Sequence, residues 1–191
     1  KIKGEKEPIL IVGGSRNPIM IKQINFLKDN TDFNELKIDI RTIFKPKNQF
    51  LNNYEDEFIR ILDSNKNLII YLDVINDDRR TINEELISKY KISFRELENK
   101  IKEAFSILTV YLIKKNYTKS LVLTGGDIAV GVCKELNISQ LEIINELLPG
   151  IPLTRATYQG QYLNIVTKAG GFGKEDTLYG LINRFQKYYE R

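Results

Sequence analysis

The sequence has 191 residues, of which 42% are hydrophobic and 10% aromatic, enough for one well-filled core. It contains no histidine and a single cysteine, which excludes histidine-based catalytic sites, histidine-ligated zinc or iron and an internal disulfide. The net charge of +4 arises from interspersed basic and acidic residues that form no basic block, which argues against nucleic-acid binding. The sequence also contains no apolar stretch of about 20 residues, the length that spans a membrane. We therefore expect a cytoplasmic protein that binds neither nucleic acid nor membrane. Any metal would be a hard cation such as Mg²⁺ on oxygen ligands, and we expect Cys133 to be a buried structural thiol.

The chain opens with a charged segment, residues 1–7, that does not begin with methionine. We expect this segment to be a linker from a preceding part of a longer chain. Residues 8–191 are then expected to form one domain.

The first predicted unit is a strand, a glycine turn and a helix. The apolar run 9–12 is typical of a strand buried on both faces of a parallel sheet, and Gly13 and Gly14 end it. Asn17 and Pro18 then supply a helix N-cap and a first-turn proline. The same β/α alternation continues further along the chain.

Two more apolar runs, 36–40 and 68–72, are predicted strands that flank a predicted helix over 54–62. A polar passage over 77–91 follows them. It leads to a long helix.

This long amphipathic helix begins at a capping box formed by Ser93 and Glu96. Apolar residues recur at three- and four-residue spacing as far as Leu112, and Lys114 and Lys115 suit a helix C-terminus. We expect the apolar stripe to pack against the core.

The remaining elements predict a second strand–glycine turn–helix unit and an antiparallel edge. A strand over 120–124 runs into a helix over 128–136, with glycines between them. Strands at 141–147, 153–157 and 162–168, with a hairpin turn at 158–161, and a final helix from 175 or 176 to 188 complete the chain. Together these elements predict an α/β fold, a mostly parallel Rossmann-like sheet with helices on both faces and an antiparallel edge hairpin near the C-terminus.

Three glycine-rich turns follow predicted strands: the first glycine turn (13–15), the second (125–127) and the last (170–173). Glycine lets the backbone approach an anion, and the free amides at the start of a helix point at it. Because the carboxyl ends of parallel strands share one edge of the sheet, the three turns can converge on one crevice. None of them matches a P-loop or a dinucleotide fingerprint. We therefore predict a phosphate site assembled from the three turns.

Four side chains near these turns are candidates for contacts with phosphate or metal. Ser15 and Thr124 offer hydroxyls and Lys168 offers a cation. The alternatives are that Ser15 is only a turn residue, Thr124 a β-branched strand residue and Lys168 a solvated strand end. Asp127 either caps the following helix or holds Mg²⁺ and orients water.

An ordered set of motifs carries a family resemblance. LVLTGGD (121–127), LPGIPL (148–153) and KAGGFG (168–173), with the IVGGSRNP of residues 11–18, resemble the C-terminal nucleotide-binding domain of four-carbon acid sugar kinases. The resemblance implies ATP-dependent phosphorylation of a sugar acid such as threonate, erythronate or 3-oxo-tetronate. It also implies an N-terminal sugar-acid-binding domain as partner, without which this chain is expected to be inactive.

The resemblance and the glycine turns together predict a nucleotide site with ATP and Mg²⁺ as cofactors. Asp127 is the predicted metal ligand, the catalytic residues are not assigned, and dimerisation is left open. The predicted nucleotide-binding residues are Gly14, Ser15, Thr124, Gly125, Gly126, Asp127, Ile128, Gly150, Lys168, Gly170, Gly171 and Gly173.

Three departures from the family pattern motivate an alternative. Ile128 stands where the family has threonine, and Asn17 and Ala169 stand where it has serine. Each departure removes a hydroxyl that could contact phosphate. A non-catalytic nucleotide-sensing or protein-interaction domain therefore remains the alternative, and a dehydrogenase-like dinucleotide binder lacks its glycine fingerprint.

Overall fold

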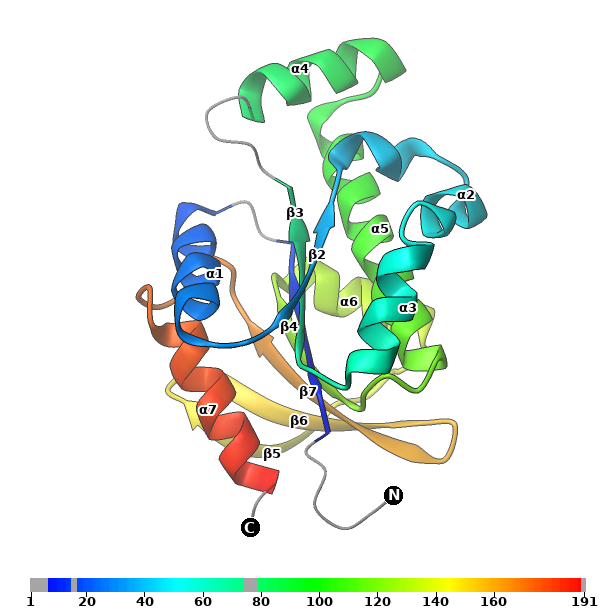
Figure 1. Cartoon of the computed structure of the whole chain (residues 1–191). Helices are drawn as coiled ribbons and strands as arrows, with labels where there is room; N and C mark the ends of the chain where they lie inside the picture. The colour runs from blue at the N-terminus through cyan, green and yellow to red at the C-terminus, as the bar shows by residue number, and fades with distance from the viewer. Residues whose placement is uncertain (1–6, 15–16, 74–78, 190–191) are drawn as a thin grey trace.

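A seven-stranded sheet in the order β2-β3-β1-β4-β7-β6-β5 forms the centre of the molecule, with helices on both faces (Figure 1). The computed structural model describes residues 7–14, 17–73 and 79–189. The strands are β1 (Ile9–Gly13), β2 (Asn34–Ile38), β3 (Leu68–Leu72), β4 (Ser120–Thr124), β5 (Glu142–Leu148), β6 (Ile151–Tyr158) and β7 (Gln161–Lys168). The helices are α1 (Pro18–Asn30), the 3-10 helix η1 (Ile40–Phe44), α2 (Lys47–Asn52), α3 (Glu55–Ser64), α4 (Arg79–Tyr90), α5 (Phe94–Lys114), α6 (Gly126–Glu135) and α7 (Thr177–Tyr189).

Four of the strand pairings are parallel and two are antiparallel. β1 lies between β3 and β4, β2 pairs with β3, and β7 pairs with β4, all in parallel. β6 runs antiparallel to both β7 and β5. The predicted fold class, a mostly parallel Rossmann-like sheet with an antiparallel edge, is confirmed.

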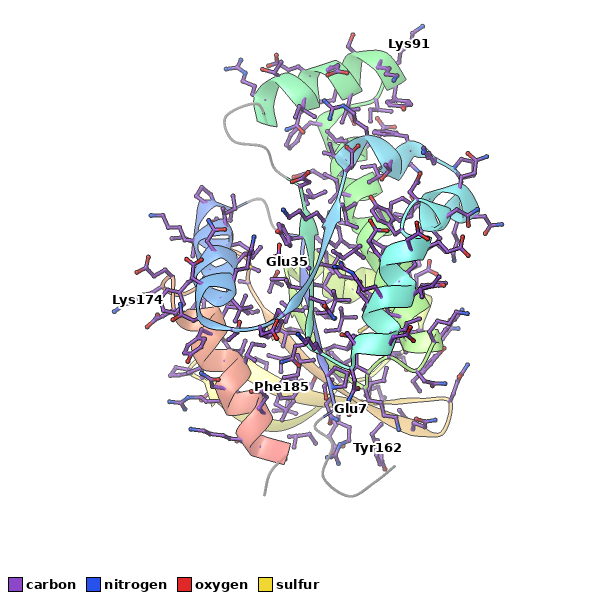
Figure 2. The ribbon with its side chains drawn as sticks, viewed as in Figure 1. Glu7, Glu35, Lys91, Tyr162, Lys174 and Phe185 are labelled. Atoms are coloured by element: carbon purple, nitrogen blue, oxygen red, sulfur yellow. The ribbon has the colours of Figure 1, made fainter. Side chains whose placement is uncertain are left out.

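Alternate residues of the central strands supply two apolar layers. Ile9 and Ile11 of β1 face the layer formed with α1 and α7. Leu10 and Val12 face the opposite layer, formed with α3, α5 and α6. Figure 2 shows Phe185 reaching from α7 toward the sheet, where it is fully buried. Because both faces are covered, the central strands are continuous apolar runs, as expected of parallel strands.

Two predicted helix starts are confirmed by their hydrogen bonds. The Asn17 side chain accepts from the Ile19 amide at 2.9 Å and Pro18 opens α1. Ser93 and Glu96 form the reciprocal capping box of α5.

Among the differences between the structure and the sequence prediction, three concern a strand end, an added helix and a cysteine. β2 ends at Ile38, because Asp39 accepts a hydrogen bond from the Arg41 amide and starts η1 there. The polar passage contains a helix, α4, whose single deeply buried residue among those described is Leu86, so its sequence shows little periodicity. Cys133 is only half-buried, and burial raises the pKa of its thiol.

None of the helices in the described ranges combines the length and the apolar character that crossing a membrane requires.

Candidate functional site

The topology opens a crevice at the carboxyl ends of β1 and β4. α1 follows β1 onto one face of the sheet, and α6 follows β4 onto the other. The chain therefore leaves two neighbouring parallel strands in opposite directions, and such a switch point is where ligands bind in open α/β sheets.

Direct contacts join the glycine turns around this crevice. A Cβ on Gly14 would overlap the Ile128 side chain, and one on Gly171 would lie 2.7 Å from Asn17 Nδ2. The Gly125 amide donates to the Lys168 carbonyl oxygen at 2.8 Å. The structure thus brings Gly14, the second turn and the last turn together, while Ser15 lies outside the described residues.

The turn that contains Gly150 lies at the same edge of the sheet. Because β6 is antiparallel to β7, the β5–β6 turn stands beside the carboxyl end of β7. Gly150 has φ +76°, and a Cβ there would lie 3.7 Å from Phe172 Cζ in the last turn. Gly150 therefore borders the site through the last turn, while Gly170 opens that turn and is half-buried.

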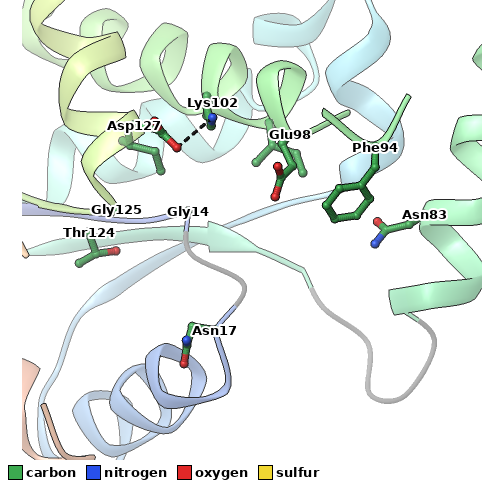
Figure 3. A pocket seen from close by; sticks show the side chains of 11 residues that line it. Gly14, Asn17, Asn83, Phe94, Glu98, Lys102, Thr124, Gly125 and Asp127 are labelled. Carbon is green, nitrogen blue, oxygen red and sulfur yellow. Dashed lines mark ion pairs between the residues drawn. The ribbon is translucent and has the colours of Figure 1, made fainter. Parts of the chain in front are cut away.

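A cavity of about 500 Å³ lies on the α5–α6 side of this crevice (Figure 3). Sequence reasoning identified the wall that the first two glycine turns form, but the last turn (170–173) and Lys168 do not line this cavity, and the wall supplied by α4 and α5 was missed. The missed lining residues are Asn83, Phe94, Glu98, Ile101 and Lys102. The available signal was that Glu98 and Lys102, one helical turn apart, lie off the apolar stripe of α5.

The second glycine turn exposes the start of α6. Gly125 has φ +100°, a conformation that favours glycine, and precedes the first helical residue, Gly126. A Cβ on Gly126 would have no neighbour within 4 Å. The positive end of α6 thus faces open space at the edge of the cavity, which suits an anion.

Asp127 does not cap α6, so that alternative is wrong. Gly125 holds the cap position, and the Asp127 carboxylate lies 2.9 Å from Lys102 Nζ, as Figure 3 shows. The described residues contain no group of three or more acidic, cysteine or histidine side chains that could hold a metal ion. A cation at Asp127 would take most of its ligands from bound phosphates or water.

Lys168 is buried at the end of β7, so its interpretation as a solvated strand end is wrong. Only 3% of the residue is exposed, and its ammonium donates to the Ala169 carbonyl oxygen at 2.9 Å. No acid within the described ranges forms an ion pair with it, and burial lowers its pKa to about 8. The register places it beside Thr124, on the face that α1 and α7 cover.

The Thr124 hydroxyl has a structural role in this structure. It is fully buried and donates to the Val12 carbonyl oxygen at 2.9 Å. A phosphate could receive its proton only if this hydrogen bond were broken. The structure therefore favours the structural interpretation of Thr124.

A buried glutamine of α1 holds the last glycine turn in place. Gln23 is fully buried, and its amide nitrogen donates to the carbonyl oxygens of Phe172 at 3.0 Å and Lys174 at 2.7 Å. Sequence reasoning missed Gln23, because its partners are carbonyl groups about 150 positions away. The last turn is therefore fastened to α1 as well as to β7.

This chain is similar to known proteins over most of its length. The family model described as nucleotide-binding C-terminal domain matches residues 10–178. A D-threonate kinase from Salmonella typhimurium is 26% identical over 187 residues, which are 97% of this chain and 44% of that protein. A D-threonate kinase from Bordetella bronchiseptica is 39% identical over 72 residues, 37% of this chain and 18% of that protein. The chain thus spans less than half the length of both curated relatives.

A solved structure supports the fold. A protein from Bordetella bronchiseptica, described as a domain of unknown function with bound citrate and as a domain-swapped dimer, superposes with a TM-score of 0.66. It is 20% identical and covers 96% of this chain and 40% of its own. At that identity the likeness concerns the fold alone.

Proposed function

This chain belongs to the family of nucleotide-binding C-terminal domains of four-carbon acid sugar kinases, and from that premise we propose that it binds ATP with Mg²⁺ at the crevice between β1 and β4. In this proposal residues 1–7 link it to a sugar-acid-binding domain, and residues 8–191 form the nucleotide domain. The longer protein phosphorylates a hydroxyl of a threonate-, erythronate- or 3-oxo-tetronate-type acid.

The observation that carries the proposal is the buried ammonium of Lys168. A buried lysine without an acid partner destabilises a fold and is rare. Lys168 stands between the two turns: its carbonyl oxygen accepts from the Gly125 amide of the second turn, and its ammonium donates to the Ala169 carbonyl oxygen just before the last turn. A phosphate at these turns would supply the anion that the fold itself does not.

The charges in the cavity favour a nucleotide that arrives with its metal. Glu98 and Asp127 each carry a formal negative charge and Lys102 a positive one, a sum of −1. A bare triphosphate would be repelled by this sum, whereas its Mg²⁺ complex carries less negative charge. Asp127, beside the start of α6, is the residue that would hold the Mg²⁺ ion, which supplies charge neutralisation between phosphates.

The chain's own contribution to catalysis would be orientation. Phosphoryl transfer depends on positioning and charge stabilisation, which backbone amides and a buried lysine can supply without histidine. The amides at the start of α6 hold the phosphates, and Lys168 offsets their charge from the opposite face of the sheet. The general base for the sugar-acid hydroxyl belongs to the partner domain in this proposal.

One observation favours a second candidate, a nucleotide-sensing domain without turnover. Ile128 is 3% exposed and fills the space against Gly14, so the position next to the second turn is apolar. ATP consumption by the longer protein on a panel of sugar acids would remove this candidate. Nucleotide binding without consumption would favour it.

Isothermal titration of Mg·ATP into this chain tests the site. Gly126→Val places a side chain in front of the first amides of α6, in space that is empty now. Gly180→Val is the matched control, because a Cβ there also has no neighbour within 4 Å and lies in α7. We expect binding by the parent and the control, and a loss of at least about tenfold in Gly126→Val. Equal affinity in both variants would refute the assignment to the second glycine turn.

A further inference from the structure

The Lys102–Asp127 ion pair lines the cavity at the first turn of α6. Lys102 Nζ lies 2.9 Å from Asp127 Oδ2, and the side chains are 32% and 73% exposed (Figure 3). The two residues come from different helices, α5 and α6, and both line the cavity together with Gly125. An exposed pair of this kind contributes little to stability.

We propose that in this ion pair the Asp127 carboxylate occupies the position that a nucleotide phosphate takes in the complex. When Mg·ATP binds, Lys102 exchanges the Asp127 carboxylate for a phosphate oxygen, and Asp127 turns to the metal. The inference rests on the proposed nucleotide site and adds to it a phosphate ligand that comes from α5. Both charges keep an opposite partner before and after the exchange. No bond is made or broken other than ion pairs and hydrogen bonds.

Geometry favours the exchange. The phosphate expected at the amides of α6 would lie within the same turn as Asp127, and Lys102 already reaches that turn. An ammonium beside a helix N-terminus is unfavourable unless an anion lies between them. Asp127 supplies that anion now, and a phosphate would replace it with more negative charge and more acceptor oxygens.

Replacing Lys102 and replacing Asp127 should change the Mg²⁺-free affinity for ADP in opposite directions. Lys102→Met should weaken ADP binding by about tenfold or more, because a charge-assisted contact is lost, and should leave adenosine binding unchanged. Asp127→Asn should strengthen ADP binding in the absence of Mg²⁺ severalfold, since Lys102 is released and a repelling carboxylate is removed. The same variant should lose most of the gain that Mg²⁺ gives the parent chain.

Lys100→Met and Glu103→Gln are matched controls. Lys100 and Glu103 form an exposed ion pair at 2.8 Å on the same helix, outside the cavity lining. The exchange is tested by titrating ADP and adenosine, each with and without Mg²⁺, into the parent chain and the four variants. Unfolding midpoints should agree among all of them, since the changed residues are exposed or partly exposed and exposed ion pairs contribute little to stability.

The outcomes separate the inference from the proposed function. If the parent chain binds neither ADP nor ATP, the proposed site fails and the inference fails with it. If the parent binds and Lys102→Met binds ADP equally well, the site stands and the exchange is refuted. Weaker Mg²⁺-free ADP binding by Asp127→Asn would refute the exchange independently.

Discussion

The two sides of the crevice each contain a lysine beside a glycine turn, but the surroundings of the two ammonium groups differ. On the closed side, between the sheet and α1 and α7, Lys168 is buried without an acid partner and Gln23 fastens the last glycine turn. On the open side, between α5 and α6, Lys102 is paired with Asp127 and both are partly exposed. A buried unpaired charge costs stability, whereas an exposed pair costs almost nothing. The closed side therefore has a fixed charge that a ligand must satisfy, and the open side has one that can exchange partners.

The largest expected effect comes from removing the charge on the closed side. Lys168→Met should weaken ADP binding by about 100-fold. The same change should raise the free energy of unfolding at pH 7 by about 1–3 kcal/mol, because a desolvated ammonium is replaced by an apolar side chain. Titration calorimetry and urea unfolding measure the two quantities.

Lys174→Met is the control for this change, since Lys174 carries the same charge next to the last turn but is exposed. We expect it to leave the free energy of unfolding within about 0.5 kcal/mol of the parent value. Unchanged ADP affinity in Lys168→Met would remove the main support for the proposed phosphate site.

The next effect is a pH dependence that belongs to the closed side. Because burial lowers the pKa of Lys168 to about 8, its ammonium deprotonates above that pH in the ligand-free chain. ADP affinity should then fall by up to about tenfold per pH unit above pH 8. Lys168→Arg should keep its affinity over the same range, because arginine stays charged.

The sign of the stability change with pH is opposite to that of affinity. The folded chain loses the Lys168 proton near pH 8, whereas an unfolded chain keeps it to about pH 10.4. The unfolded state thus binds more protons in this window, so the Lys168 contribution to the free energy of unfolding rises with pH. In Lys168→Met this rise should be absent, and a rise equal to that of the parent would contradict the assignment.

Sequence alone could predict the units from which both sides are built. Apolar runs followed by glycines identified β1 and β4, and the rule that parallel strands end at one edge predicted that their turns converge. The burial of Lys168 could not be predicted, since it depends on β7 lying next to β4 in the sheet. Lys102 was missed because its role depends on how α5 lies over α6, which an apolar stripe does not specify.

A smaller effect tests the backbone of the open side. Gly125→Ala should lower the free energy of unfolding by about 1–3 kcal/mol, because φ +100° is unfavourable for a residue with a Cβ. Gly126→Ala is the matched control, since a Cβ there has open space and its φ is not in the positive region. It should change stability by no more than about 1 kcal/mol, in the stabilising direction. If urea unfolding showed the same loss of free energy of unfolding in both variants, the second turn would adopt another conformation.

The smallest expected effect concerns the hydrogen bonds by which Gln23 of α1 holds the last glycine turn on the closed side. Gln23→Met keeps a similar length and volume but removes the hydrogen bonds to the Phe172 and Lys174 carbonyl oxygens. We expect a loss of about 1 kcal/mol in the free energy of unfolding, because the two carbonyls lose a donor while an apolar side chain is gained. Gln49→Met is the control, since Gln49 is an exposed glutamine of α2.

ADP affinity should fall with the stability in Gln23→Met, because the last turn would no longer hold its position over Lys168. If stability fell while ADP affinity stayed at the parent value, the last turn would have no part in phosphate binding, and Lys168 would act through the second turn alone.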